Sequence, residues 1–413
     1  MSRPEGLAEP RSTPKLLSID EALALVEARV TPLPAEEVSI VHAYGRYIAQ
    51  ELRAAIDLPP FASSAMDGYA LRAEDTPGSL TVVGESSAGS PYTGELGRGE
   101  TVAISTGAVV PAQADAVVPI ENVSSGREQI EVASAVEPEA FVRNRGSDIE
   151  RGNLILEPGT RLGSAQIGAA AAVGLATVLC RRRPSVAVVT TGTELRQPGE
   201  PLADGQIYDA NGPMLTAALL TSGAGVEHIP AAADTAEGHR AALTRALEHD
   251  VVISSGGVSV GPHDLVRSIG QELGVTEVFW RIALRPGKPL AFGVRDSTLV
   301  FGLPGNPVSS LVCFELFVRP ALLALQGAKR AQPAWIPGVL GAAVKRNPER
   351  EDLIRVRYDT AEGSALLLPV HGQQSHQIAI TAQADALARV PMGTGELPAG
   401  TEVACLPLVR LGD

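Results

Sequence analysis

The 413-residue chain lacks the cysteine pattern and the long apolar runs that mark several large classes of protein. Its three cysteines, Cys180, Cys313 and Cys405, form no CxxC pair, so neither a zinc site nor a disulfide framework is indicated, and a reducing cytoplasm fits. The N-terminus carries charges and prolines without an apolar core, which predicts a loose tail over residues 1–17 and no signal peptide. No apolar run is long enough for a membrane helix, so no membrane partner is predicted.

Basic and aromatic residues are also scarce. There are 34 lysines and arginines against 47 acids, a formal charge of −13, and aromatic residues make up only 4%. A nucleic-acid partner is excluded because no basic surplus exists to displace the counterions of its backbone. An anionic ligand would therefore need local basic residues, set against a repulsive overall field. The length of the chain predicts two to four domains.

Three similar stretches lie between Val251 and Ser310. They are VVISSGGVSVGPHD (residues 251–264), RPGKPLAFG (285–293) and FGLPGNPVSS (301–310), and each resembles a buried strand that runs into a glycine- or proline-rich loop. Loops at the carboxyl ends of strands form the ligand crevice of an open α/β sheet. Two more strand-end loops, TGTE (191–194) and YDAN (208–211), belong to the same pattern. We therefore predict one site assembled by a sheet.

The residue types in these loops indicate an anionic ligand. Glycines allow positive φ, so that successive N–H groups form a concave nest for negative oxygens. Asn306 suits a helix N-cap and Pro307 the first helical position, which would direct free N–H groups to the same crevice. Arg285 and Lys288 add positive charge. Any one of these loops alone is equally well explained as an ordinary tight turn.

Hydrophobic patterning predicts a multidomain fold of the α/β plus β class. A discontinuous α+β linker domain is expected, in which a helix over residues 22–30 packs on a small-residue helix over 163–174. The other parts are a β-rich domain, a doubly wound α/β domain and a small C-terminal β-barrel or sandwich, of which we expect the C-terminal β-barrel. In chain order, the predicted boundaries are 18–52 with 144–182 for the linker domain, 53–143 for the β-rich domain, 183–330 for the α/β domain and 331–413 for the barrel.

Eight motifs in order carry a resemblance to a known family. They are PPFASSAMDGYAL, STGA, RGSDI, TGTEL, GQIYDAN, SSGGVSVGPHD, RPGKPLAFG and GLPGNPVS. On these residues the chain resembles the MoeA-type molybdopterin molybdotransferases, the bacterial counterpart of the gephyrin E domain. The resemblance implies four domains per subunit, a molybdopterin-binding type of α/β domain and an elongated cytoplasmic homodimer. It also implies a reaction in which adenylylated molybdopterin and molybdate give molybdenum cofactor and AMP, with Mg²⁺.

The resemblance further implies which residues form the site. The cleft would lie between the α/β domain of one subunit and the β-rich domain of the other, which would contribute Asp67 and Thr106. Magnesium prefers carboxylate and phosphate oxygens, and cleavage of a phosphoanhydride needs charge stabilisation more than a protein nucleophile. The catalytic candidates are Asp67, Asp148, Glu194, Asp264 and Lys288; the substrate-binding candidates are Thr106, Gly256, Gly257, Ser259, Arg285, Pro304, Gly305, Pro307, Arg355 and Ser375; and the metal ligands are Glu194, Asp234 and Asp264.

Several of these residues also have a purely structural interpretation. Asp67 could form an Asx-turn with Gly68. Asp148 could pair with Arg143 or Arg145, and Asp234 could cap the helix that follows it. Arg355 shares a predicted strand with Arg357 and could belong to a solvated face. Arg285 stands where many relatives have lysine, and arginine binds oxyanions with a different geometry.

Two competing functions are considered. A nucleotide-pyrophosphate hydrolase of the competence-damage type shares the α/β domain, but such proteins have a GGLGPT-like loop where this chain has GGVSVGPHD. A non-catalytic scaffold like the gephyrin E domain could lose the site acids, whereas this chain retains them. Possible protein partners are the adenylyltransferase of the same pathway and apo-molybdoenzymes. The sequence does not separate molybdate from tungstate, since both are tetrahedral dianions of similar size.

Overall fold

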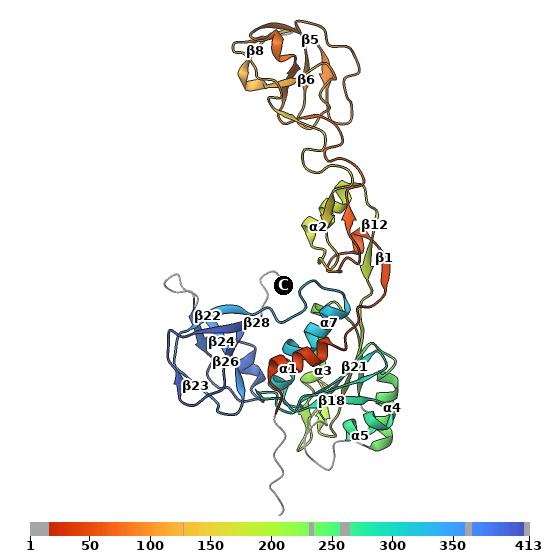
Figure 1. Cartoon of the computed structure of the whole chain (residues 1–413), viewed down its shortest axis with the longest axis vertical. Coiled ribbons are helices and arrows are strands. Elements are labelled where there is room, and N and C mark those ends of the chain that lie inside the picture. Colours follow the sequence, from red (N-terminus) through yellow and green to blue (C-terminus); the bar gives the residue numbers. More distant parts are fainter. Residues whose placement is uncertain (1–15, 127, 231–234, 257–264, 360–365, 409–413) are drawn as a thin grey trace, which may run out of the picture. The chain divides into compact units, whose positions relative to one another are not determined.

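A computed structural model describes residues 16–126, 128–230, 235–256, 265–359 and 366–408. The chain divides into two compact units. The first combines Met1–Glu36 with Arg181–Asp413, and the second is Glu37–Cys180 (Figure 1). The finer domain boundaries within these units stay predictions.

The first unit is built on a six-stranded sheet. Four neighbouring strands pair in parallel, which requires crossover connections such as helices between them. Two further strands at one edge join the sheet through antiparallel pairings. The central strands are almost wholly buried, as a sheet covered on both faces requires. The order is β16 (Gly225–Pro230), β13 (Ser185–Thr190), β17 (Val251–Ser255), β21 (Thr298–Leu303), β20 (Ala291–Arg295) and β18 (Thr276–Trp280).

Helices cover both faces of this sheet, which confirms the predicted doubly wound α/β fold. One face carries α4 (Ala236–Ala246) and α5 (Leu265–Glu272). The other carries α3 (Asn211–Thr221) and a continuous helical segment made of α6 (Pro307–Cys313), a π-helical turn (Phe314–Val318) and α7 (Arg319–Leu325).

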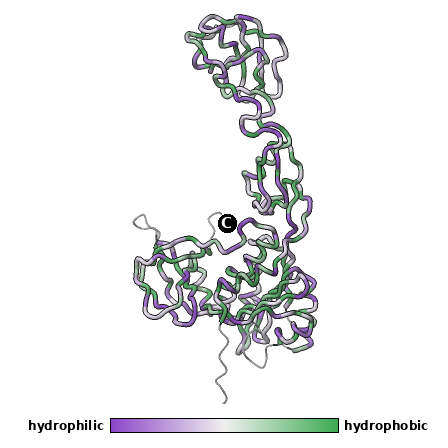
Figure 2. The backbone as a smooth tube through the Cα atoms, in the orientation of Figure 1, coloured by the Kyte–Doolittle hydropathy of each residue, from purple (hydrophilic) through white to green (hydrophobic). Residues whose placement is uncertain are grey.

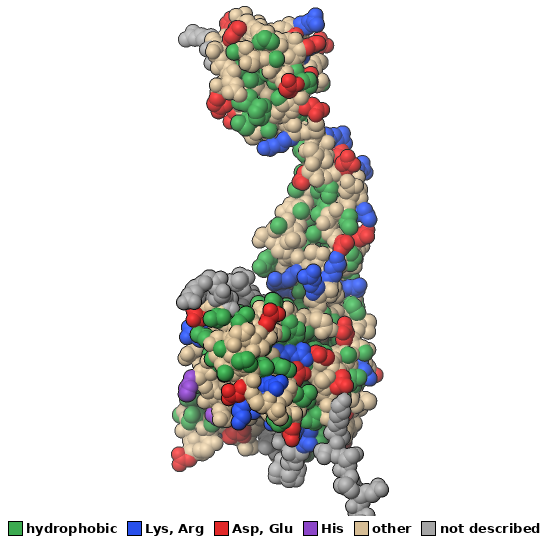
Figure 3. Space-filling model, turned by 60° about the vertical axis from the view of Figure 1, so that its left-hand side comes forward, with side chains coloured by type: hydrophobic (Ala, Val, Ile, Leu, Met, Phe, Trp, Pro, Cys, Tyr) green, Lys and Arg blue, Asp and Glu red, His purple; other side chains and the backbone are tan. Residues whose placement is uncertain are grey.

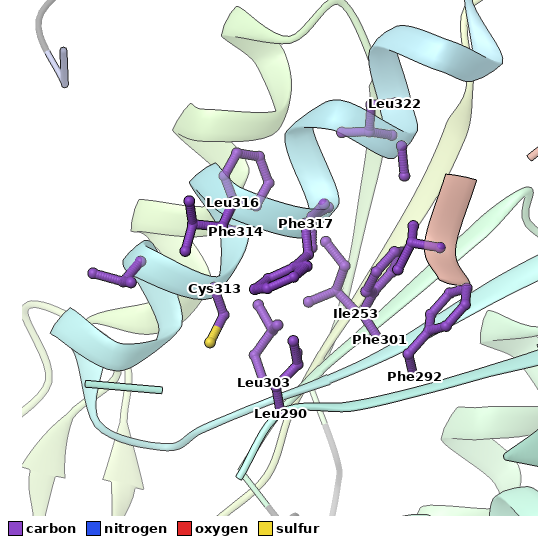
Figure 4. Close-up of a cluster of buried hydrophobic side chains, with 14 of the residues drawn as sticks. Ile253, Leu290, Phe292, Phe301, Leu303, Cys313, Phe314, Leu316, Phe317 and Leu322 are labelled. Atoms are coloured by element: carbon purple, nitrogen blue, oxygen red, sulfur yellow. The ribbon is translucent and has the colours of Figure 1, made fainter. Parts of the chain in front are cut away.

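The segment from α6 to α7 is the central helix of the first unit. Figure 4 shows Phe317 directed from it toward Ile253, Phe301 and Leu303 of the sheet, while the Cys313 thiol donates to the Gly287 carbonyl. Pro307–Leu325 is also apolar and long enough to cross a membrane by length and composition, but 83% of its apolar window is buried inside the protein. Among the described residues it is the one such segment, and its burial identifies it as a core helix.

The first helix does not pack where the sequence predicted. In α1 (Ile19–Glu27), Ile19, Ala22 and Val26 belong to the core of the first unit, beside the π-helical turn and α7. The expected partner, α2 (Ser164–Ala172), lies in the second unit and buries Ala170 in a separate core. The broad aliphatic stripe of α1 fits the aromatic and leucine-rich surface of the central helix, whereas the small side chains of α2 offer little area for it.

A closed five-stranded barrel follows the α/β sheet in the same unit and confirms the predicted C-terminal barrel. The short strand β19 (Leu284–Arg285) leaves the α/β region and pairs with the start of β24, placing Arg285 opposite Asp352. This pairing brings the RPGK loop to the barrel. The barrel strands in their closed order are β24 (Glu351–Asp359), β25 (Leu366–Pro369), β22 (Ile336–Leu340), β28 (Glu402–Pro407) and β26 (Ala386–Val390).

The second unit contains another six-stranded sheet, as the predicted β-rich region requires. Gly68 sits where an added Cβ would lie 2.0 Å from the carbonyl oxygen of Val118, so only glycine allows the two strands to approach. Hydrophobic and hydrophilic stretches alternate along the backbone of both units (Figure 2). The sheet order is β7 (Ala116–Pro119), β4 (Gly68–Leu71), β6 (Glu100–Ile104), β5 (Gly78–Ser86), β9 (Gln129–Val132) and β8 (Val123–Ser125).

A smaller part of the second unit surrounds α2. Its buried residues include Val38, Ile48, Leu52 and Leu162, which form one cluster with Ala170. The short strands here and at the border with the six-stranded sheet are β1 (Ala35–Ser39), β2 (Leu52–Arg53), β3 (Ser63–Ser64), β10 (Val142–Arg143), β11 (Leu154–Leu156) and β12 (Thr177–Arg181).

Candidate active site

A pocket of about 650 Å³ opens at the carboxyl ends of the parallel strands β13 and β17. Its walls come from the loops after β13, β17 and β21 and from the loop before α3, which is where an open α/β sheet binds its ligand. The structure therefore brings four of the five predicted loops together, whereas the fifth, the RPGK loop, lines a second pocket because β19 pairs with β24. Among its lining residues are Thr191, Gly192, Glu194, Tyr208, Asp209, Asn211, Ser255, Gly256, Gly305, Asn306, Pro307 and His376.

Glu194 is the exposed carboxylate of this pocket. It lies on the loop after β13, just before the short strand β14 (Leu195–Arg196), which pairs with β15 (Ile207–Tyr208). Gly192 has φ +150°, and a Cβ added there would lie 2.6 Å from the Glu194 carboxylate oxygens. The glycine of TGTE therefore leaves room for the acid to turn back over its own loop.

Gly256 shows the positive φ that the sequence predicted for the glycine loop. Its φ is +96°, and an added Cβ would lie 3.0 Å from the Thr191 hydroxyl oxygen. Its N–H donates to the carbonyl of Leu303, which ties the ends of β17 and β21 together. Four other candidates, Gly257, Ser259, Asp264 and Asp234, lie outside the described residues.

Asn211 joins three of the loops, although sequence reasoning assigned it no role. Its side-chain amide donates to the Ser255 hydroxyl at 2.8 Å and to the Gly305 carbonyl at 2.7 Å. It thus connects the start of α3, the end of β17 and the turn before α6. The motif GQIYDAN was the sequence signal that could have identified it.

Asp209 is a second residue that sequence reasoning left unassigned. It is 2% exposed, and one carboxylate oxygen accepts a hydrogen bond from the Gly212 N–H at 2.9 Å. The other oxygen lies 3.9 Å from Nε2 of His228 and has no hydrogen-bond partner among the described residues. His228 Nε2 in turn lies 3.0 Å from the Thr190 hydroxyl. These contacts fix the floor of the pocket around the entry to α3.

A second pocket of about 470 Å³ lies on the other side of the Pro304–Pro307 turn. Asn306 lines both pockets, so the two adjoin at this turn. Arg285 forms an ion pair with the buried Asp352, in the register set by β19 and β24. Other lining residues are Lys288, Pro304, Ser309, Arg350, Gln373, Gln374 and Ser375.

The structure places Arg355 beneath this second pocket and not on a solvated face. The side chain is fully buried, and its Nη2 donates to the carbonyls of Gly372 at 3.0 Å and Gln374 at 3.3 Å. Desolvation lowers the pKa of Arg355. Arg355 is absent from the lining of both described pockets, and its contacts support the loop that carries Ser375. The backbone N–H of Val308 then donates to the Ser375 carbonyl at 3.1 Å.

Asp67 and Thr106 meet in the second unit. The Thr106 N–H and hydroxyl donate to one Asp67 carboxylate oxygen at 2.6 and 2.9 Å, and these bonds lower the pKa of Asp67. The contact joins two separate loops, so it is not the local Asx-turn considered above. Asp148 is exposed, and its carboxylate makes no hydrogen bond or ion pair within the described chain; Arg145 pairs with Asp57 instead.

Acidic and basic side chains are interspersed over the surface that Figure 3 shows. The local arrangement of charge therefore matters more than the total of −13. The first pocket presents Glu194, backbone groups and a buried acid, whereas the second presents Arg285, Lys288 and Arg350. Together they suit an extended ligand that carries an anionic group at one end and binds a cation at the other.

A doubly wound domain with a strand-end pocket, followed by a barrel that supplies a basic pocket, defines a multidomain ligand-binding protein. Comparison with known families gives three matches in order. Residues 17–174 match the MoeA N-terminal region (domain I and II), 187–324 the probable molybdopterin binding domain, and 337–408 the MoeA C-terminal region (domain IV).

Individual relatives agree with these matches. A molybdopterin molybdenumtransferase of Haemophilus influenzae is 34% identical over 96% of this chain and 100% of its own. Molybdopterin molybdenumtransferase 2 of Mycobacterium tuberculosis is 35% identical over 89% and 93%. A crystal structure of a molybdopterin biosynthesis MoeA protein from Pyrococcus horikosii has a TM-score of 0.81, with 34% identity over 96% of this chain and 100% of that one. The chain belongs to the molybdopterin molybdenumtransferase family.

Proposed function

We propose that the chain is a transferase of molybdenum cofactor biosynthesis. It inserts molybdenum from molybdate into adenylylated molybdopterin and releases AMP. The proposal is supported by family membership and by one structural observation: the acidic strand-end pocket and the basic pocket adjoin at the Pro304–Pro307 turn. A phosphate-containing ligand and a tetrahedral oxyanion could then lie side by side.

We assign the phosphate end of the substrate to the first pocket. The backbone around Gly256 and Gly305, together with the start of α6 at Pro307, can offer N–H groups to the pyrophosphate. Molybdate is assigned to the second pocket, where Arg285 and Lys288 supply charge and Ser375 a hydroxyl. Pro304 shapes the turn between them, and Arg355 holds the Ser375 loop in place.

Magnesium fits the first pocket. No cluster of three or more potential metal ligands is present in the part of the chain that the structure describes. Mg²⁺ needs only one or two carboxylates, because it keeps several waters and binds substrate phosphates. Glu194 offers such a carboxylate, and we propose that Asp234 and Asp264, outside the described residues, act with it. When bound, the ion neutralises charge that develops on the pyrophosphate.

We also propose a homodimer in which Asp67 and Thr106, with Asp148, serve the cleft of the other copy. The Asp67 carboxylate is held by two hydrogen bonds yet stays exposed, so it is ordered before any ligand arrives. Three large apolar side chains near this contact are 38 to 51% exposed, as expected for a surface covered in an assembly. Met66 precedes Asp67, and Ile120 and Phe141 are joined to the same loop by backbone hydrogen bonds to Asp67 and Ala65.

Mixing two inactive variants tests this arrangement. Asp67→Ala and Glu194→Gln chains should each be inactive alone but should recover part of the activity when co-expressed, because one of the two clefts in a mixed dimer then contains both intact residues. Co-expression of Lys288→Gln with Glu194→Gln is the control, since both residues lie in the same unit and no cleft is restored. Equal failure of the two mixtures would contradict the composite cleft.

The reaction itself separates the candidate functions. Purified chain is incubated with adenylylated molybdopterin, molybdate and Mg²⁺, and both AMP and active cofactor are measured, the latter by reconstitution of an apo-molybdoenzyme. We expect both products. Release of AMP without cofactor would favour a pyrophosphate hydrolase, and neither product would favour a scaffold. A cytoplasmic location and contacts with the pathway's adenylyltransferase and apo-molybdoenzymes are part of the proposal. The buried side chains of Cys180, Cys313 and Cys405 form no disulfide within the described residues, which fits a reducing compartment.

A further inference from the structure

Arg350 lies in the basic pocket beside the two cations that the sequence identified. It precedes β24 directly, and its backbone N–H donates to the Asn347 side chain at 3.1 Å, which fixes the turn that carries it. The guanidinium makes no hydrogen bond or ion pair with any residue in the described ranges, and its Nε is buried. An arginine that is partly buried without a partner is unfavourable unless an anion completes its surroundings.

Positive charge exceeds negative charge around Arg350. Arg285, Lys288 and Arg350 contribute three positive charges to the lining of this pocket, and Asp352 contributes one negative charge. Arg285 contacts the Asp352 carboxylate directly, and Arg350 acts on it through space. The Lys288 ammonium has no hydrogen-bond or ion-pair partner among the described residues. The described lining residues therefore give the pocket a net charge of +2, with Lys288 and Arg350 free to bind a ligand.

We propose that Arg350 is a third cationic ligand of the oxyanion pocket and that it matches the pocket to a tetrahedral dianion. The identification of this dianion as molybdate rests on the proposed function. The match between the charge of the pocket and the charge of a dianion does not depend on it. A guanidinium binds two oxygens of an oxyanion through parallel N–H groups, which an ammonium cannot do. A fixed charge of +2 also favours a dianion over a monoanion of the same shape, because the monoanion leaves one cation uncompensated.

Two anions of equal geometry test the charge match. Molybdate is a tetrahedral dianion and perrhenate is a tetrahedral monoanion. Isothermal titration calorimetry with the full chain, without any pterin, measures the affinity for each. We expect tighter binding of molybdate, and we expect Arg350→Gln to weaken molybdate binding about tenfold or more, the effect of losing a charge-assisted hydrogen bond. Perrhenate binding should fall less.

Two further variants control the experiment. Arg350→Lys restores the charge without the paired N–H groups and should recover part of the lost affinity. Arg357→Gln removes an exposed arginine from the same strand and should leave both affinities unchanged. The midpoint of urea unfolding shows whether each variant retains its fold.

The outcomes separate this inference from the proposed function. If Arg350→Gln binds molybdate as the wild type does while Arg285→Gln and Lys288→Gln do not, the role of Arg350 is wrong and the pocket assignment survives. If none of the three substitutions changes molybdate binding, the assignment of molybdate to this pocket fails as well. An equal loss for molybdate and perrhenate in Arg350→Gln would overturn the charge match alone.

Discussion

The two pockets on either side of the Pro304–Pro307 turn are built in different ways. The first is made of strand-end loops, and its polar groups are backbone N–H groups, small hydroxyls and acids close to their own strands. The second depends on a contact between distant parts of the chain, because β19 places Arg285 opposite Asp352, 67 residues away. Local turn chemistry thus specifies the loops of the first pocket, which the sheet brings together, whereas the second pocket also needs the pairing of β19 with the barrel.

The largest expected effect is a loss of catalysis in a first-pocket variant that still binds molybdate in the second pocket. Replacing Glu194 with glutamine removes the exposed carboxylate of the first pocket while keeping its size. We expect the rate of cofactor formation to fall by about 100-fold or more, as for loss of one preorganised electrostatic group, with molybdate affinity unchanged. Turnover assays and calorimetry on the same preparation measure both quantities.

A matched substitution in the second pocket should give the reverse pattern. Lys288→Gln removes the positive charge and leaves a neutral polar side chain of similar length. We therefore expect weaker molybdate binding and little change in the affinity for AMP, which serves as a probe of the first pocket. If Glu194→Gln weakens molybdate binding as much as Lys288→Gln does, the two pockets do not act separately and the comparison fails.

This contrast explains how much of the structure could be predicted from the sequence. The strand-end pocket followed from glycine and proline placement, since Gly256 has the positive φ that its loop needs and Pro307 begins α6. Both are local properties. Arg350 and the buried role of Arg355 could not be predicted, because burial and pocket lining depend on how β24 pairs with its neighbours.

The packing of α1 shows the same limit. Its capping box at Ser18 and Glu21 and its apolar stripe are local and were readable, but an amphipathic stripe does not specify which surface it covers. Asn211 was missed for a related reason. An asparagine at the start of a helix suggests only a cap. Its structural role here is to donate two side-chain hydrogen bonds to loops that are 44 and 94 residues away.

The second largest effect concerns Asn211, which ties the first pocket to the turn that both pockets share. Asn211→Ala removes both donated bonds, so we expect the free energy of unfolding to fall by about 1–2 kcal/mol and the affinity for AMP to decrease. Asn211→Asp should be at least as harmful, because a carboxylate cannot donate to the Gly305 carbonyl. Urea unfolding and calorimetry measure these changes.

A nearby substitution controls for general damage. Gln197→Ala alters an exposed residue of the loop after β14 whose side chain makes no hydrogen bond to a described residue, and it should have no effect on stability or on AMP binding. An Asn211→Ala variant with wild-type stability and AMP affinity would show that the three loops hold their places without this bridge.

A smaller effect is expected at Asp352, the one acid among the described residues that line the basic pocket. Asp352→Asn removes its negative charge and raises the net charge of the pocket, so molybdate affinity should increase a few-fold although an ion pair has been broken. Calorimetry measures the affinity. Glu349→Gln, which removes an exposed acid from the adjacent turn, should change it less. Weaker binding in Asp352→Asn would mean that the carboxylate serves mainly to orient Arg285.

The same variant changes the pH dependence of stability. Burial raises the pKa of Asp352, and the lowering effects of Arg285 and Arg350 do not offset it. The folded protein therefore holds this proton more tightly than the unfolded chain, so the carboxyl group stabilises the fold in acid and that contribution is lost as the pH rises through its pKa. The gap in unfolding free energy between Asp352→Asn and wild type should thus shift in favour of the variant from acid to neutral pH, as urea titrations at several pH values would show.

The smallest effect is expected at the Asp67–Thr106 contact in the second unit, where a backbone N–H group and a small hydroxyl are the polar groups, as in the first pocket. The two hydrogen bonds from Thr106 lower the pKa of Asp67, so the contact favours the ionised carboxylate and is lost as the pH falls through that pKa. Thr106→Val keeps the backbone donor and removes the hydroxyl, so the pKa of Asp67 should rise only part of the way to its usual value, whereas Thr106→Ser should leave it unchanged. Carbon-detected NMR titration of the Asp67 carboxyl measures this pKa, and equal values in Thr106→Val and wild type would assign the whole effect to the backbone N–H.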